Sequence, residues 1–156
     1  MKKIKKLWRK VKKYTTNQYV KAGFRFTRFY EKGKVSDNII LFQAYDGSSL
    51  SGNPYYILKE MSRNPEKYNK FEIYVACKKN TEKIISNIIK NESLLNARTI
   101  IVHSKKYCEI LATAKYLINN STFSPYFIKK DEQIYLNTWH GTPLKAMGRD
   151  IVDSPF

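Results

Sequence analysis

The stretch NIILFQAY, residues 38–45, is a run of mostly apolar residues that leads into the polar segment DGSSLSGN, residues 46–53. A short apolar run bounded by a turn-forming loop is typical of a strand buried in a parallel sheet. Pro54 follows the loop, and proline is favoured at the first position of a helix because the N–H that it lacks has no partner there. We therefore predict a buried strand, a loop and a helix from Pro54 to about Arg63, which Pro65 ends.

The alternation of strand and helix patterns continues along the rest of the chain. In the segment 81–91, four isoleucines fall on one helical face, whereas the segments before and after it are short apolar runs. Strands and helices that alternate at this spacing favour parallel βαβ units, so the expected class is α/β with a Rossmann-like parallel sheet flanked by helices. The further strands are expected at 71–77, 99–103, 116–119 and 133–138, the further helices at 81–91 and 104–115, and a loop or short helix at 121–128.

Composition sets the size and the charge of the protein. The chain has 156 residues, of which 42% are hydrophobic, so it can bury the core of one domain. The net charge of +16 predicts an anionic partner, which is nucleic acid, a membrane surface or a phosphate-bearing substrate. Eleven lysines and arginines precede Glu31, the first acidic residue, so most of the excess charge lies in the segment 1–34.

Residues 1–14 have the pattern of a basic amphipathic helix. Ile4, Leu7, Val11 and Tyr14 recur at helical spacing, and basic residues fill the opposite face. This pattern favours contact with an anionic membrane surface, and aromatic and basic residues at 24–30 extend that contact. The alternatives are a helix that packs on the body of the protein and a nucleic-acid-binding arm. The residues assigned to the membrane are Lys2, Lys3, Lys5, Lys6, Trp8, Arg9, Lys10, Lys12 and Lys13.

Two absences from the sequence limit the class of protein further. No run of about 18 apolar residues is present, so we expect neither a membrane span nor a secreted protein. Cys77 and Cys108 form no CxxC pair and have no histidine at metal-ligand spacing, so we expect buried thiols, no metal site and no cofactor. His103, at the end of a predicted strand, is expected to be a partly buried structural histidine.

The segment WHGTPLK, residues 139–145, places a histidine on the turn between a strand and a helix. Turns after the carboxyl ends of parallel strands open into the ligand crevice, and Gly141 lets the backbone come close to a ligand there. Thr142 is expected to cap the helix, whose free N–H groups attract an anion, and Lys145 adds a positive charge. We therefore predict His140 as a proton acceptor beside a phosphate-binding helix start.

The loop at 46–53 follows the first strand as a phosphate-binding loop does. It lacks the G-x-G-x-x-G pattern and the lysine of a P-loop. We assign it to contact with substrate or with a second domain, through Asp46 and Ser48.

Three blocks of the chain resemble one protein family, the CDP-glycerol glycerophosphotransferases of teichoic acid synthesis. The blocks are LFQAYDGSSLSGNP at 41–54, LATAKYLINN at 111–120 and QIYLNTWHGTPLKAMGRD at 133–150. Their order and spacing fit the family, and the resemblance covers about 35–156.

The resemblance implies an acceptor-side domain at 35–156, which is the N-terminal half of a GT-B type enzyme. It implies His140 as the catalytic base, CDP-glycerol as the donor, a lipid-linked acceptor as the partner, and a peripheral place on the cytoplasmic face of the bacterial membrane. The family's second, nucleotide-binding domain is expected to be absent from this chain, so CDP-glycerol would bind only if that domain is supplied. The alternative is a non-catalytic truncated homologue that binds membrane or acceptor.

Overall fold

The strand predicted at the start of the 38–54 block is the central strand of the sheet. A computed structural model describes residues 17–139, and in it β1 (Ser36–Gln43) pairs with a strand on either side. The sheet has the order β3-β2-β1-β4-β5, and every pairing is parallel, which confirms the predicted Rossmann-like class. The other strands are β2 (Glu72–Cys77), β3 (Arg98–Ile101), β4 (Ala114–Asn119) and β5 (Ile134–Asn137).

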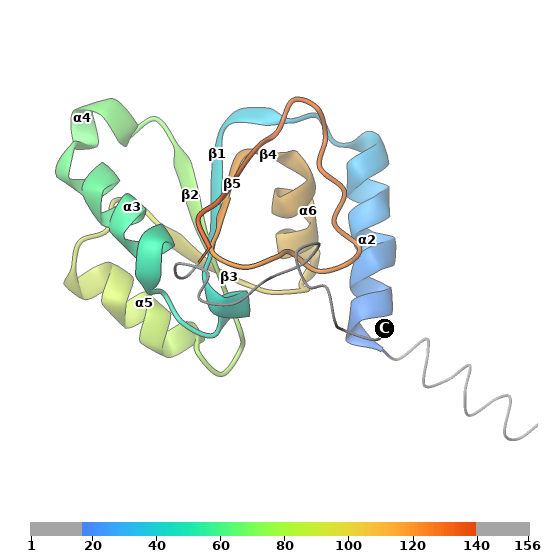
Figure 1. The fold of residues 1–156 in the computed structure, drawn as a ribbon, viewed down its shortest axis with the longest axis horizontal. Helices are drawn as coiled ribbons and strands as arrows, with labels where there is room; N and C mark the ends of the chain where they lie inside the picture. Colours follow the sequence, from blue (N-terminus) through green and yellow to red (C-terminus); the bar gives the residue numbers. More distant parts are fainter. Residues whose placement is uncertain (1–16, 140–156) are drawn as a thin grey trace, which may run out of the picture.

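Helices cover both faces of this sheet (Figure 1). Successive side chains of β1 point to opposite faces, so Leu41 packs in one apolar cluster and Phe42 in the other. The Phe42 face is covered by α3 (Gly52–Arg63), α4 (Pro65–Tyr68) and α5 (Glu82–Asn91), and the Leu41 face by α6 (Lys105–Thr113) and α2 (Gln18–Lys32).

Helix α2 is part of the core, and the sequence pattern did not predict it. Asn17 caps its start, with the side chain accepting a hydrogen bond from the Tyr19 N–H at 2.9 Å. Ala22 and Phe26 are buried against α6. The interpretation of residues 24–30 as a membrane contact is therefore wrong for Phe26, whereas Phe24 on the opposite side is 75% exposed.

Most predicted boundaries differ from the structure by one or two residues. Helix α6, expected to reach residue 115, ends at Thr113, and β4 begins at once with Ala114. The turn needs no loop because the buried Gln133 side chain donates to the carbonyls of Leu111 and Ala114, at 3.0 and 2.8 Å. Pro65 follows the end of α3 as predicted, but it also opens the short helix α4.

Several predictions fall on residues that lie outside the described range, namely the basic segment 1–14 and the turn and helix from His140 onward. Within residues 17–139, no helix is long and apolar enough to cross a membrane. Cys77 and Cys108 are free and buried, as predicted.

Candidate functional site

A crevice lies at the carboxyl edge of the sheet, where β1 and β4 are neighbours. The chain leaves β1 toward α3 on one face and leaves β4 into a loop on the other face (Figure 1). Parallel α/β sheets bind their ligands at such a switch in strand order. A cavity of about 770 Å³ occupies this place, and its walls are α2, Asp46 and residues 122–126.

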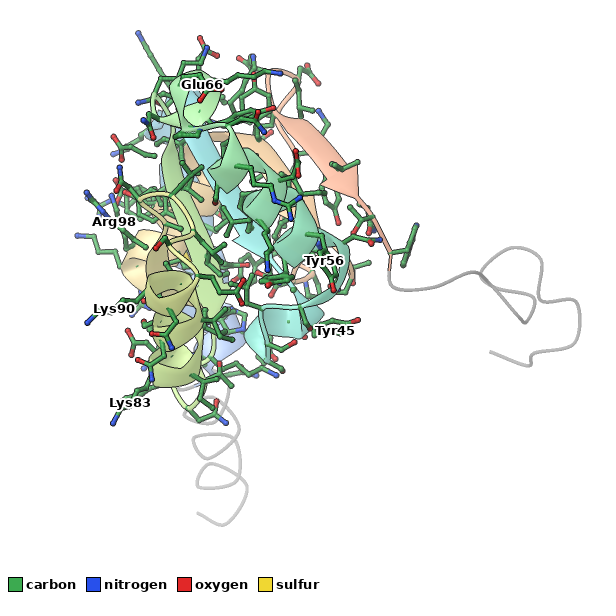
Figure 2. The ribbon with its side chains drawn as sticks, turned by 90° about the vertical axis from the view of Figure 1, so that its left-hand side faces the viewer. Tyr45, Tyr56, Glu66, Lys83, Lys90 and Arg98 are labelled. Atoms are coloured by element: carbon green, nitrogen blue, oxygen red, sulfur yellow. The ribbon has the colours of Figure 1, made fainter. Side chains whose placement is uncertain are left out.

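The turn after β1 is held in a left-handed conformation that fixes Asp46. Tyr45, Asp46 and Gly47 have φ angles of 46°, 59° and 76°. The first two are costly for residues with a side chain, and Gly47 is required by space, since a Cβ there would lie 2.8 Å from Val102 Cγ2. The Gly47 carbonyl is anchored by the N–H of Lys78, at 2.8 Å. The turn places the Tyr45 side chain toward α3 (Figure 2), whereas Asp46 lines the crevice beside α2.

A chain of buried polar groups stands behind Asp46. The Tyr107 hydroxyl donates to Gln43 Oε1 at 2.7 Å, and Gln43 Nε2 lies 3.5 Å from Asp46 Oδ1. Tyr107 and Gln43 are both buried, and burial raises the pKa of the Tyr107 hydroxyl well above its ordinary value. The hydroxyl therefore stays a donor, so the amide of Gln43 is oriented with its N–H₂ toward Asp46.

His103 lines a smaller cavity together with Asp46. It also has a positive φ of 67°, and its Nδ1 lies 2.6 Å from the Tyr126 hydroxyl. The ring packs on Tyr19 with centroids 4.6 Å apart, and the His103 carbonyl accepts a hydrogen bond from Arg25. Burial lowers the pKa of His103, and the negative charge of Asp46 opposes that shift more weakly. The expected partly buried histidine is thus found, but it borders a cavity.

That second cavity, of about 280 Å³, adjoins the first. Tyr19, Asp46 and Ser124 line both cavities. The second one also has His103 and two lysines, Lys78 and Lys79, in its walls.

Two asparagines end β4 at the same edge. The Asn120 side chain accepts a hydrogen bond from the Tyr45 N–H at 2.9 Å, and the Asn119 side chain accepts two from Ser121. Both side chains are fully buried, and the Nδ2 group of each has no hydrogen-bond partner within the described part of the chain. Unsatisfied buried amides are rare in proteins, and each one calls for an explanation such as a bound water, an ion or a catalytic role.

Strand β5 brings Thr138 and Trp139 to this edge. The Thr138 N–H donates to the Asn119 carbonyl at 2.8 Å, and the Asn53 side chain donates to the Thr138 carbonyl at 3.3 Å. Trp139 follows with a φ of 50° and is half exposed.

The structure places only some of the predicted site residues. His140, Gly141, Thr142 and Lys145 lie outside the described range, as do the basic residues assigned to the membrane. Asp46 lines both cavities, whereas Ser48 lines neither and accepts a hydrogen bond from Lys78 Nζ at 2.7 Å.

Other residues of the crevice were not predicted. They are Tyr19, Gln43, Tyr126 and the two asparagines, Asn119 and Asn120. A polar residue at the end of an apolar strand, as in Gln43 and Asn119, is the signal that points to this edge. Nothing in the sequence pairs Tyr126 with His103. Within residues 17–139, no group of three His, Cys, Asp or Glu side chains gathers that would hold a metal ion.

A parallel sheet of this strand order, with helices on both faces and a crevice at its switch point, defines a Rossmann-like domain. A family model described as CDP-Glycerol:Poly(glycerophosphate) glycerophosphotransferase matches residues 24–155, and the chain belongs to this family. The match begins inside α2, earlier than the resemblance at about 35–156 suggested.

Several relatives are teichoic acid enzymes. The teichoic acid poly(glycerol phosphate) polymerase of Bacillus spizizenii is 31% identical over 116 residues, which are 74% of this chain and 27% of that protein. The teichoic acid glycerol-phosphate transferase of Staphylococcus aureus is 27% identical over 127 residues, 81% of this chain and 30% of that protein.

A solved structure also shares the fold. It is a variant of the wall teichoic acid polymerase TagF soaked with CDPG, and it has a TM-score of 0.70 at 21% identity, over 92% of this chain and 34% of that chain. At this identity the likeness concerns the fold alone. The chain thus spans about a third or less of the length of these relatives.

Proposed function

We propose that this chain is the acceptor-side, base-bearing domain of a glycerophosphotransferase that moves glycerol phosphate from CDP-glycerol to a lipid-linked teichoic acid acceptor. The observation that carries the proposal is the position of Trp139 at the crevice edge, in a chain of this family. His140 is the next residue in the sequence. In this proposal the family's histidine acts at the edge of the sheet that carries Trp139, Asp46 and Asn119.

In the proposed reaction, His140 accepts the proton of an acceptor hydroxyl while that oxygen attacks the β-phosphorus of CDP-glycerol. The bond from this phosphorus to the oxygen that links it to the α-phosphate breaks, and cytidine monophosphate leaves. A neutral imidazole has a pKa near 6.5 and suits this task at neutral pH. Gly141 admits the phosphate to the backbone, and the helix start at Thr142 with Lys145 stabilises the negative charge of the transition state.

Both walls of a water-excluding cleft take part in such a transfer. We propose that a separate nucleotide-binding domain supplies the donor side, either from the same polypeptide or from a partner. The limited share of the relatives that the chain spans supports this view.

We further propose that the basic residues from Lys2 to Lys13 hold the domain on the cytoplasmic face of the membrane, at its anionic surface. Each basic residue near an anionic leaflet contributes about 1 kcal/mol of attraction. Removing residues 1–14 is expected to release the protein from vesicles that contain phosphatidylglycerol. Unchanged vesicle binding after this deletion would contradict the membrane assignment.

The test of transfer uses labelled CDP-glycerol and a lipid-linked acceptor analogue. The chain is assayed alone and together with the separately produced remainder of the Bacillus spizizenii relative. Transfer is expected only in the mixture, and a His140→Ala chain is expected to abolish it. Turnover by the chain alone would contradict the proposal that a separate nucleotide-binding domain supplies the donor side. Acceptor binding without transfer in the mixture would favour the second candidate, a non-catalytic homologue that binds membrane or acceptor.

A further inference from the structure

The two adjoining cavities beside α2 differ in chemistry. The larger one has aromatic side chains in its walls, including Tyr19, Phe123 and Tyr126, together with the hydroxyls of Thr122 and Ser124. The smaller one has two lysines against the single carboxylate of Asp46. The two lysines outnumber the carboxylate, so the smaller cavity has a net positive charge, and burial lowers the pKa of His103, which disfavours a further charge on its ring. The two cavities together therefore present an apolar wall, groups that bind hydroxyls, and cations, one beside the other.

Asp46 stands at the junction of the two cavities and is held there at a cost. Its φ of 59° and that of its neighbour Tyr45 are unfavourable, yet Gly47 and the Lys78 N–H keep the turn in place. The buried Gln43 amide orients one of its carboxylate oxygens. Strain that the surroundings maintain around one exposed carboxylate is typical of a pre-organised ligand contact.

A carboxylate accepts hydrogen bonds from hydroxyls, and lysines attract phosphate. Aromatic faces cover the carbon skeleton of a ligand, and a cavity of about 770 Å³ lies within the usual size of ligand sites. The chemistry that fits all three features is a polyol joined to a phosphate group. Two molecules offer it, namely a poly(glycerol phosphate) segment and the ribose phosphate of a cytidine nucleotide.

We infer that this double cavity binds a glycerol phosphate segment of the acceptor polymer, with Asp46 on the glycerol hydroxyls and Lys79 on the phosphate. The choice of the polymer over the nucleotide rests on the proposed function, in which this domain is the acceptor side. The double cavity lies at the same edge of the sheet as Trp139, so a bound segment can extend toward Trp139.

The test is direct binding to the 156-residue chain, measured by calorimetry without any donor. The probes are a synthetic glycerol phosphate trimer, inorganic phosphate and cytidine monophosphate. The trimer is expected to bind at least tenfold more tightly than inorganic phosphate and than the nucleotide. Equal affinity for inorganic phosphate, or tighter binding of cytidine monophosphate, overturns the inference.

Three variants locate the site. Asp46→Asn keeps the shape and tolerates a positive φ, and it is expected to weaken trimer binding about tenfold or more, because it removes a charged hydrogen-bond acceptor. Lys79→Gln, an exposed position, is expected to weaken binding and to reduce its salt dependence. Lys83→Gln is the control, since Lys83 projects from α5 on the sheet face opposite α2 (Figure 2).

The inference is wrong if Asp46→Asn and Lys79→Gln both bind the trimer with unchanged affinity. It is also wrong if Lys83→Gln loses as much affinity for the trimer as these two variants do. The unfolding midpoint of each variant shows whether it is folded. Binding needs neither donor nor turnover, so a trimer that binds through Asp46 supports this inference even where the transfer assay fails. Transfer that depends on His140 supports the proposed function even where the trimer does not bind at the double cavity.

Discussion

Replacing Gly47 by alanine is expected to destabilise the protein strongly, whereas the same change at Gly23 is expected to stabilise it. Gly47 has a φ of 76°, where a residue with a Cβ costs about 1–2 kcal/mol. The new Cβ would also lie 2.8 Å from Val102 Cγ2 and 3.1 Å from the Cys77 backbone. Carbon atoms pack at about 3.5–4.0 Å, and forcing an overpacked core apart costs about 1–3 kcal/mol. The two terms together predict a loss of about 2–5 kcal/mol.

Gly23 is the matched control because it lies inside helix α2. A Cβ there would meet Tyr126 Cβ at 3.5 Å, which is an ordinary contact. Alanine in a helix interior is better than glycine by about 0.5–1 kcal/mol. Urea unfolding followed by circular dichroism gives both free energies of unfolding. A loss below about 0.5 kcal/mol for Gly47→Ala, or equal losses at the two positions, would refute the geometry derived for the turn that carries Asp46.

Three further predictions concern the core and the crevice. Phe26→Ala is expected to lower the free energy of unfolding by about 3–5 kcal/mol because Phe26 is buried. Phe24→Ala, at an exposed position, is expected to change it by less than about 0.5 kcal/mol in the same urea assay. Similar values for the two variants would mean that α2 does not pack on the core. The pKa of His103 is lowered in the folded state, so the unfolded chain binds a proton at this residue at higher pH than the folded chain does. The free energy of unfolding is therefore expected to fall as the pH drops below about 6.5, and His103→Asn is expected to reduce this dependence on pH. An unchanged dependence in the variant would show that His103 is not its source. Burial raises the pKa of Cys77 and of Cys108 to about 11, so both thiols are expected to resist iodoacetamide at pH 8 until urea unfolds the chain, and rapid labelling of the folded protein would show that they are accessible.

The sheet was predictable from the sequence because each strand is an apolar run that ends at a turn signal. The run at 38–45 became β1, and the runs at 71–77 and 99–103 became its neighbours on one side. The strand order results from crossovers between neighbouring strands and from one crossover that leaves β3 at the sheet edge and passes β2 and β1 to reach β4. The apolar pattern alone does not set that order, which the pairing of β1 with β4 shows.

Helix α2 was not predictable in the same way. Its segment carries glycine and several aromatic residues, which are weak helix formers, so packing of Ala22 and Phe26 on α6 decides the conformation rather than local preference. The crevice depends on α2 for a wall. The contact of Tyr126 with His103 joins residues 23 positions apart and arises only from tertiary structure. The sequence therefore predicted Asp46 as a site residue but not its position beside the His103 and Tyr126 pair.

The distribution of backbone strain supports the crevice independently of any motif. Among residues 17–139, six residues other than glycine have a positive φ. Four of them, Tyr45, Asp46, His103 and Trp139, directly follow the carboxyl ends of β1, β3 and β5. Each costs about 1–2 kcal/mol, so this edge stores several kcal/mol in a protein whose whole stability is of the order of 5–15 kcal/mol. A fold gains nothing in stability from such strain. Its concentration at the carboxyl edge of the sheet, where residues 17–139 leave the Nδ2 groups of two buried asparagines unsatisfied, is typical of a pre-formed ligand site.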